Sequence, residues 1–146
     1  MWQGSDIAQF PSQAEASAGA RLRADADAVA RAARLARGFA AQTGLDPAAA
    51  SRLTVVVEEW VTNVVTHGGP QAGARIVLRL SLSEEVVRLW ISDGGRPFDP
   101  RAAVFEGPDL EHGGGSGLAL IAGFCRITGY ARLGGRNRLV LEMPLE

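Results

Sequence analysis

A chain of 146 residues most naturally forms one domain. At this size roughly 70% of the surface of the unfolded chain is buried, so a single core needs no disulfide. The hydrophobic fraction is 47%, and all the lysine-or-arginine positions are Arg. The formal net charge is −1, so neither sign of charge is in excess and the composition gives no sign of affinity for nucleic acids or membranes.

No apolar run reaches the ~18 residues of a membrane span. The first residues have neither a basic region nor an apolar region of a signal peptide, so we expect a cytoplasmic protein. Cys125 is the only cysteine and cannot form an intrachain disulfide. It lies in an apolar run, where a free cysteine is usually a small buried hydrophobe, and a redox or metal role is the less favoured alternative.

The predicted elements follow a loose lead-in at residues 1–17. In chain order they are a strand at 18–23, helices at 25–42 and 47–67, strands at 75–83 and 86–92, a helix at 118–125, and strands at 128–134 and 138–145. Residues 93–117 form a long irregular stretch, and loops of that length within a domain are usually functional or disordered. The order predicts a single α+β domain over residues 1–146, a two-layer α/β sandwich with a mostly antiparallel mixed sheet and helices on one face.

Local signals fix the helix ends. Asp46 is a suitable N-cap, and Pro47 at the first helical position needs no hydrogen-bond donor. Gly44 is a plausible C-cap of the preceding helix, and the sequence Gly-Gly-Pro from Gly68 ends the second one. The second helix has a wide apolar face, formed by Leu53, Val56, Val57, Trp60, Val61 and Val64.

Three polar residues recur every fourth position on the second helix: Glu59, Asn63 and His67 share one face, away from the centre of the apolar face. A carboxylate one turn from a carboxamide can orient a nucleophile while the amide oxygen binds a hard cation such as Mg²⁺. An ordinary solvated helix face is the alternative, and the pair alone does not exclude it.

The end of the strand at 86–92 is followed by two glycines. Asp93 can accept a hydrogen bond from an exocyclic amine such as that of adenine. Gly95 allows the backbone to approach a flat ligand closely, and Phe98 follows within the same loop. An ordinary Asp-Gly turn is the alternative.

A second glycine-rich segment precedes the third helix. It contains Gly113, Gly114, Gly115, Ser116, Gly117 and Leu118. Converging backbone N–H groups and the positive end of the helix dipole favour phosphate there. A flexible linker is the alternative. The segment is neither a P-loop, because Gly-Lys-Ser/Thr is missing, nor a dinucleotide fingerprint, because it does not follow a first strand.

Together, the runs EEWVTNVVTHG, DGGRPFDP and GGGSGLALI resemble the N, G1 and G2 boxes of the GHKL ATPases, with the greatest similarity to the anti-sigma factor serine/threonine kinases. The similarity covers the chain from about residue 18 to its end. It implies a Bergerat-type fold and a site for ATP and Mg²⁺.

The resemblance also assigns roles within that site. Glu59 matches the general base, Asn63 the Mg²⁺ ligand, Asp93 the adenine-reading aspartate and Gly95 the glycine under the base. His67 matches a pocket-lining position at the end of the N box. Nucleotide contacts are further implied for Phe98, Gly113, Gly114, Gly115, Ser116, Gly117 and Leu118. The implied partner is a STAS-type anti-anti-sigma protein phosphorylated on serine; many members also sequester a sigma factor, and homodimers are common.

Three residues depart from the pattern. Trp60 stands where a small residue is usual, Pro97 replaces a common glycine, and Gly113 stands where some kinases have a basic residue. The short acidic lid, residues 101–112, offers no obvious replacement, with Arg96 and Arg101 the nearest candidates. Because phosphoryl transfer depends on positioned charge, a nucleotide-gated regulator with little catalysis is the alternative function. A detached histidine kinase domain is disfavoured, since no phosphoacceptor helix pair is present.

Overall fold

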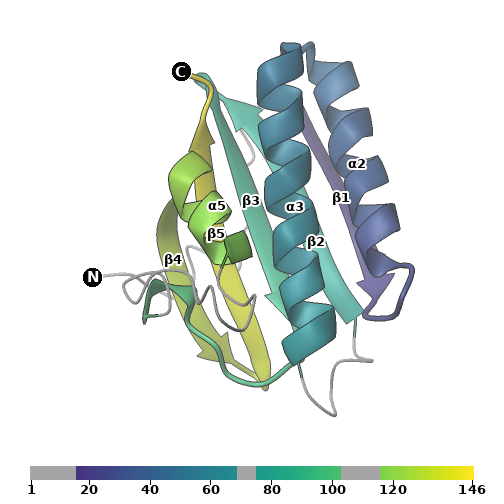
Figure 1. Ribbon diagram of the computed structural model, residues 1–146, viewed down its shortest axis with the longest axis vertical. Coiled ribbons are helices and arrows are strands. Elements are labelled where there is room, and N and C mark those ends of the chain that lie inside the picture. Colours follow the sequence, from purple (N-terminus) through teal and green to yellow (C-terminus); the bar gives the residue numbers. More distant parts are fainter. Residues whose placement is uncertain (1–15, 69–74, 103–115) are drawn as a thin grey trace.

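The computed structural model describes residues 16–68, 75–102 and 116–146 of the chain. Figure 1 shows a sheet of five strands with helices packed against it. The elements are β1 (Ala16–Arg23), α2 (Ala28–Thr43), α3 (Pro47–His67), β2 (Arg75–Ser83), β3 (Val86–Asp93), α5 (Ser116–Phe124), β4 (Arg126–Leu133) and β5 (Arg136–Pro144). Their order is the predicted one, so the expectation of an α+β sandwich is confirmed.

The sheet has the strand order β1-β2-β3-β5-β4, and all four neighbouring pairs are antiparallel. The sequence predicts a mostly antiparallel sheet, and the described pairs are antiparallel throughout. Two tight hairpins account for much of this, because a two-residue turn can join only antiparallel strands. Both turns have two residues with positive φ, as hairpin turns of type I′ require: Glu84 (53°) and Glu85 (63°), and Gly134 (58°) and Gly135 (74°).

The helix ends follow mostly from the capping residues. Asp46 accepts a hydrogen bond from the Ala49 amide at 2.8 Å, and Gly44 ends α2 in the left-handed region with φ of 69°. The predicted start of α2 at residue 25 is three residues too early. A turn is closed there instead, since Asp25 accepts from the Asp27 amide at 2.9 Å and donates its own amide to the Arg23 carbonyl at 2.8 Å.

The last two strands each begin two residues earlier than predicted, at Arg126 and Arg136. The Cys125 amide still closes the final turn of α5 by donating to the Ile121 carbonyl at 2.8 Å, and β4 starts at the next residue. A register shift between Ile127 and Gly129 interrupts the pairing with β5. This irregularity obscures the alternation that would have marked the start of β4 in the sequence.

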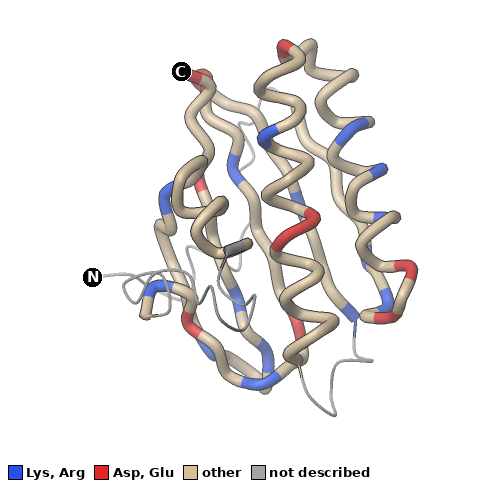
Figure 2. The backbone as a smooth tube through the Cα atoms, in the orientation of Figure 1, with Lys and Arg blue, Asp and Glu red and all other residues tan. Residues whose placement is uncertain are grey.

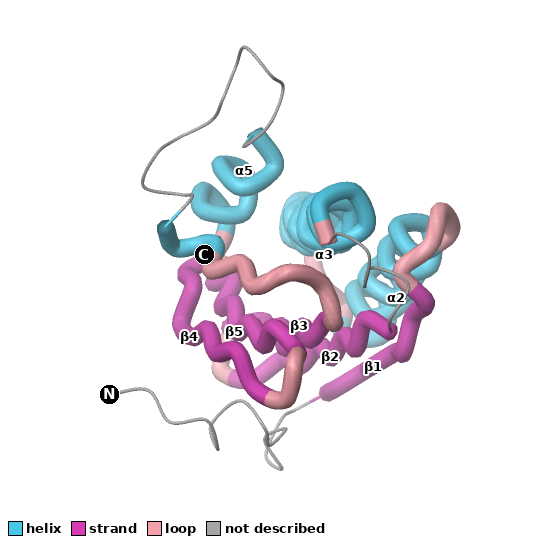
Figure 3. Tube along the Cα trace, turned by 90° about the horizontal axis from the view of Figure 1, so that it is seen from below, coloured by secondary structure: helices cyan, strands magenta, loops and turns pink. Residues whose placement is uncertain are grey.

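The core lies between one face of the sheet and the three helices α2, α3 and α5. Figure 3 shows these helices side by side on the same face. The predicted apolar face of α3 is buried in full, with Leu53, Val56, Val57 and Val61 at 0% exposure. Inward-facing residues alternate along the strands, including Leu78 and Leu80 in β2 and Leu89 in β3. No helix within the described residues is long and apolar enough to cross a membrane.

Candidate functional site

The N-terminal end of α5 packs against the middle of α3, at Glu59. A Cβ added at Gly117 would collide with Glu59 Oε2 and lie 3.1 Å from its Cδ. A side chain at residue 117 would require the Glu59 carboxylate, the movable end of its side chain, to shift away from the start of α5. Glu59 and Asn63 are half-buried, and His67 is exposed at the last position of α3. Two of the predicted motifs thus meet at one surface.

Asp93 ends β3 with its side chain buried, at 3% exposure. Its Oδ1 accepts two hydrogen bonds, from the Gly95 amide at 2.9 Å and from Asn137 Nδ2 at 3.1 Å. Within the described residues no hydrogen bond reaches the second oxygen, Oδ2. A carboxylate held through one oxygen keeps the acceptor capacity of the other for a donor such as an exocyclic amine.

Gly95 joins the loop after β3 to the end of α3. A Cβ at this position would lie 3.0 Å from Gly68 Cα and 3.0 Å from Asp93 Oδ1. The Arg96 amide donates to the Gly68 carbonyl at 2.9 Å. The close approach places the loop beside the helix that carries Glu59 and Asn63, and a side chain at residue 95 would force them apart.

Sequence reasoning missed a set of residues on β4 and β5 that hold this loop. Asn137 donates to Asp93 and, at 2.7 Å, to the Arg96 carbonyl, while its Oδ1 accepts from the Phe98 amide at 3.2 Å. Tyr130 donates a short hydrogen bond to the same Oδ1.

The Arg132 guanidinium also donates to the Gly95 carbonyl at 2.6 Å. One signal was available in the sequence: Asn137 is a polar residue at a position that alternates with Leu139, Leu141 and Met143. A polar residue in such a series indicates a buried hydrogen-bonding role.

The departure at Trp60 has a structural counterpart. Trp60 is 1% exposed. The centroids of the Trp60 and Phe98 rings are 6.1 Å apart, and the two ring planes are tilted by 31°. Such a tilted pair is a favourable aromatic arrangement. Its indole Nε1 is buried without a hydrogen-bond partner among the described residues. Phe98, half-buried, therefore rests on the helix residue next to Glu59, and the large side chain links the loop to α3.

Asp99 immediately precedes a short helical stretch that begins at Pro100. It accepts from the Arg101 guanidinium, the closest contact being 2.6 Å, and from the Arg101 amide at 3.0 Å. The hydrogen bond from the Arg101 side chain lowers the pKa of Asp99 below its ordinary value. Arg101 is thus engaged with Asp99, whereas the side chain of Arg96, the other nearby cation that the sequence singled out, is exposed. Pro97 is exposed in the same loop.

Part of the predicted phosphate-binding segment lies outside the described residues. Gly113, Gly114 and Gly115 belong to residues 103–115, as does most of the predicted lid. Ser116 is the first residue of α5, followed by Gly117 and Leu118, both half-buried. The described part of the segment therefore forms the first turn of a helix, the setting in which backbone N–H groups favour an anion.

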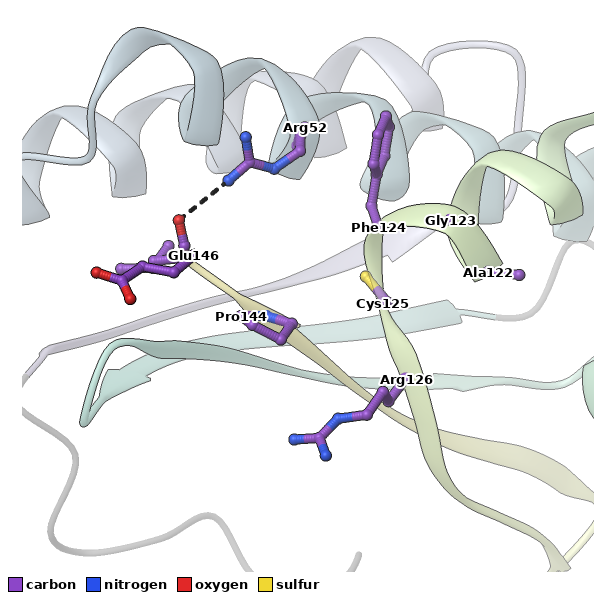
Figure 4. A pocket seen from close by; sticks show the side chains of 9 residues that line it. Arg52, Ala122, Gly123, Phe124, Cys125, Arg126, Pro144 and Glu146 are labelled. Atoms are coloured by element: carbon purple, nitrogen blue, oxygen red, sulfur yellow. Dashed lines mark hydrogen bonds between the residues drawn. The ribbon is translucent and has the colours of Figure 1, made fainter.

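A cavity of about 390 Å³ lies elsewhere, at the C-terminal end of α5 (Figure 4). Arg52 from α3 and Arg126 from β4 contribute to its lining, and the Arg52 guanidinium donates to the Leu145 carbonyl at 3.4 Å. None of the predicted site residues lines it.

Cys125 lines the same cavity and is 7% exposed. Burial raises its pKa to about 12, so the thiol is protonated at neutral pH. The expectation of a buried cysteine is confirmed.

The donor groups fit a nucleotide with a hard cation better than a metal centre made by the protein alone. No group of three or more His, Cys, Asp or Glu side chains suited to a metal ion occurs in residues 16–68, 75–102 and 116–146. Asn63 supplies an amide oxygen, which suits Mg²⁺ when phosphates and water complete the coordination. Asp93 supplies a buried carboxylate oxygen that can accept from a donor, and Gly117 has no side chain between the start of α5 and Glu59.

Comparison with known proteins agrees with this arrangement. The family model described as the histidine kinase-like ATPase domain matches residues 22–143. No curated protein matches the chain.

Two solved structures are similar in fold. One contains the RsbU and RsbW domains of Rv1364c from Mycobacterium tuberculosis, with 21% identity, a TM-score of 0.60, and coverage of 88% of this chain and 33% of the other. This chain thus spans about a third of that protein chain. The other is the SiaB-SiaC complex from Pseudomonas aeruginosa, with 12% identity, a TM-score of 0.57, and coverage of 86% and 88%.

Proposed function

The chain belongs to the histidine kinase-like ATPase domain family, and we propose that it binds ATP with Mg²⁺ and phosphorylates a serine of a partner protein. The observation that carries the proposal is the meeting of three segments along the C-terminal half of α3. The Asp93 loop contacts Gly68 at the C-cap of α3, and Gly117 at the start of α5 contacts Glu59 two turns earlier. A nucleotide bound there can have its base at the loop and its phosphates between α3 and α5.

At the adenine end, Asp93 accepts a hydrogen bond from the exocyclic amine. Its Oδ1 is engaged by Gly95 and Asn137, which orient the carboxylate and keep it buried before the base binds. A buried acceptor that loses its donor carries a large desolvation penalty. The site therefore favours adenine over guanine, whose carbonyl at the corresponding position cannot donate.

At the phosphate end, the backbone N–H groups of Gly117 and Leu118 bind phosphate oxygens, together with the preceding glycines and Ser116. Asn63 holds Mg²⁺ through its amide oxygen. When bound, Mg²⁺ neutralises charge on the phosphates and supports phosphoryl transfer. Phe98, on the loop after β3, and His67, at the end of α3, are the further residues that we expect to line the site.

Glu59 is the proposed catalytic residue. Its carboxylate accepts the proton of the attacking serine hydroxyl while the serine oxygen bonds to the γ-phosphorus. The bond from that phosphorus to the β,γ-bridging oxygen breaks, and ADP leaves. General-base catalysis of this kind contributes about 10²- to 10⁴-fold to a rate.

We further propose a STAS-type anti-anti-sigma protein as the phosphorylated partner, with a sigma factor as a second binding partner of a homodimer. The resemblance of the three boxes to the anti-sigma factor kinases supports this assignment. The names of the two similar structures record a second domain or protein beside the first, RsbU with RsbW in one and SiaB with SiaC in the other, which supports a protein partner.

The alternative is a nucleotide-gated binding protein with little transfer activity. The packing of Glu59 against Gly117 favours it, because a carboxylate held at the start of α5 stands close to where phosphate would bind. In that case ATP controls the affinity for a partner and no serine is labelled.

One experiment separates the two. Wild type, Glu59→Ala and the matched control Glu58→Ala are incubated with γ-labelled ATP and a STAS-domain protein, and nucleotide affinity is measured in parallel. Glu58 is the neighbouring half-buried carboxylate on α3. The kinase predicts label on serine with wild type and Glu58→Ala, and little with Glu59→Ala at nearly unchanged ATP affinity. Equal transfer by Glu59→Ala would remove its catalytic role, and absence of label with wild type would favour the alternative.

A further inference from the structure

The first strand of the chain lies at an edge of the sheet. β1 pairs with β2 on one side, and no strand among the described residues pairs with its other side. The pairing is continuous from Ala16 to Arg23, without the bulge or proline that commonly protects an edge strand. Along such a strand every second residue turns its N–H and its C=O to the same side, so about four residues of β1 turn these groups to the free edge. β1 is therefore a template for one further strand.

A cavity of about 510 Å³ lies beside this edge, between β1 and α2, the outermost strand and helix on that side of the molecule (Figure 3). We call it the edge groove. Its apolar wall consists of Ala18 and Ala20 of β1 and Leu35 and Phe39 of α2. The two alanines are only half-buried, because their side chains are too short to fill the space below α2. Gly38 leaves further room, since a Cβ added there would meet nothing within 4 Å.

A strand added beyond β1 would lie where the edge groove opens. Neighbouring strands are about 4.8 Å apart, and alternate side chains of the added strand would point to the side of the sheet that carries α2. Leu35, Gly38 and Gln42 recur at helical spacing on the side of α2 that lines the groove. Small apolar side chains of the added strand would therefore pack against this side of α2, as those of a core strand do.

The charge at the edge groove is positive. Arg31 and Arg34 of α2 contribute to its lining and are exposed, and no acidic residue lines it. α2 as a whole has three arginines, Arg31, Arg34 and Arg37, and no acidic residue. Asp25 and Asp27 lie outside the lining, in the turn that joins β1 to α2, and Figure 2 shows acidic positions at this turn and basic positions along the helix. In a chain with a net charge of −1, this edge therefore favours a partner with negative charge.

We propose that the free edge of β1 and the edge groove bind an extended, acidic segment of a partner protein. The segment pairs with β1 as a further strand and places alternate apolar side chains in the groove, the mode of recognition called β-strand addition. Its carboxylates bind Arg31 and Arg34 at the rim of the groove. The inference does not rest on nucleotide binding, because none of the groove residues belongs to the proposed site for ATP.

Charge and backbone chemistry together select this occupant over two others. A second copy paired through β1 would bring the same basic side chains of two α2 helices together over one sheet, and like charges repel. A nucleic acid lacks the alternating N–H and C=O groups with which a free strand edge pairs. An acidic protein segment satisfies both the edge and the arginines.

The first test measures the binding of a labelled, end-capped peptide of four Val-Glu repeats at low salt, without nucleotide, so that its failure is distinguishable from failure to bind ATP. Arg31→Glu/Arg34→Glu changes the rim of the groove. Arg37→Glu/Arg126→Glu is the control, since it changes the net charge equally at two exposed arginines outside the groove. We expect the rim pair to weaken binding about tenfold or more and the control pair about twofold or less. Equal weakening by both pairs, or no binding to wild type, would overturn the proposal.

The second test fills the groove without removing a charge. Gly38→Phe places a ring in open space on α2, and Gly123→Phe does the same on α5, where an added Cβ also meets nothing within 4 Å. We expect Gly38→Phe to weaken peptide binding about tenfold or more and Gly123→Phe to leave it within about twofold. Urea denaturation checks that both variants are folded. Unchanged affinity of folded Gly38→Phe would contradict a binding site in the groove.

The third test addresses strand pairing itself. Methylation of the peptide's backbone nitrogens removes the N–H donors of either the valines or the glutamates, and in an extended segment these two sets face opposite edges. We expect one set of methyl groups to abolish binding and the other to leave it nearly unchanged. Binding that tolerates both sets would overturn strand addition.

Two further measurements address the other occupants. In sedimentation of wild type alone, a dimer that Gly38→Phe dissociates would assign the groove to a second copy, and its absence supports a different partner. The full chain with Asp6→Asn/Glu15→Gln tests whether the acidic residues of its own first 15 residues compete with the peptide. Unchanged peptide affinity supports an external partner, and an affinity raised about tenfold would assign the groove to this segment instead.

Discussion

The Asp93 loop and the start of α5 flank the same helix, yet different forces hold them there. The loop is fixed by a network of hydrogen bonds in which Asn137 contacts Asp93, Arg96 and Phe98. The start of α5 is placed mainly by packing, through the close approach of Gly117 to Glu59. Polar networks impose one geometry, whereas a packed helix can move as a unit when a ligand changes the contact. On the proposed function, the end that would bind adenine is therefore preformed, and the end that would bind phosphate depends on the separation of α3 and α5.

The largest effect is expected from breaking the network. Asn137→Ala leaves Asp93 Oδ1 and the Arg96 carbonyl with fewer partners in a buried setting, at a cost of about 2–4 kcal/mol in the free energy of unfolding. Urea denaturation measures the loss, and ATP affinity falls with it because Asp93 is no longer oriented. Tyr130→Phe, which removes only one hydroxyl from the same network, is the matched control and costs about 1 kcal/mol. Equal losses in the two variants would show that Asn137 is not the centre of the network.

The packed end is tested at Gly117. Gly117→Ala introduces a Cβ against the Glu59 carboxylate, and because that carboxylate is the movable end of a side chain, the cost is about 1 kcal/mol, the lower end of the range for overpacking. Gly123→Ala in the same helix is the control, since its Cβ would meet nothing within 4 Å. That substitution is expected to be neutral or to stabilise by up to about 1 kcal/mol.

Adding Glu59→Ala to Gly117→Ala removes the group that the new Cβ meets. The double variant should recover most of the lost stability in a double-mutant cycle measured by urea denaturation. Additive losses would contradict a direct contact between the two residues.

A smaller loss of stability is expected at the exposed part of the Asp93 loop, where Arg101 pairs with Asp99. Arg101→Ala removes the ion pair with Asp99 and lowers stability by about 0–1 kcal/mol near neutral pH, because the pair is partly exposed. Asp99 has a lowered pKa, so this stabilisation is present above the pKa of its unfolded state and is lost as the pH falls through its folded pKa. Unfolding midpoints of wild type and Arg101→Ala are measured across that acidic range, with Arg96→Ala as the control. The difference between wild type and Arg101→Ala should shrink as the pH falls. A difference that grows on acidification would be inconsistent with this expectation.

The last prediction concerns the reactivity of the Cys125 thiol, which lies away from both ends of the proposed site. Since burial raises its pKa to about 12, the native thiol should react only slowly with a thiol reagent at mildly alkaline pH. The reaction becomes fast in urea, which serves as the control. Rapid, complete reaction of the native protein would show that α5 opens readily at its C-terminal end.

The parts of the structure that the sequence predicts are those set by local rules. Asp46 and Gly44 end helices through their own backbone and side-chain chemistry, and the apolar face of α3 follows from its periodicity. The start of α2 was placed too early, because a competing turn around Asp25 involves hydrogen bonds that composition does not reveal.

The loop network was missed for a different reason. Asn137 and Tyr130 make hydrogen bonds that hold a loop far earlier in the chain. Asp93 and Asn137, for example, are 44 positions apart. Their role depends on the pairing of β3 with β5, which brings Asp93 opposite Asn137. Nothing in the sequence near either residue specifies that pairing, so the polar position in β5 could be noticed but not given a partner.

The central claim is that Asp93, Asn63 and the start of α5 form a site for ATP with Mg²⁺. Its most direct test is a calorimetric titration of ATP into wild type and Asn63→Ala, each with and without Mg²⁺. The account predicts saturable binding to wild type that Mg²⁺ strengthens, and binding to Asn63→Ala that is weaker and no longer responds to Mg²⁺. Absence of ATP binding to folded wild-type protein, or an unchanged Mg²⁺ response in Asn63→Ala, would contradict it.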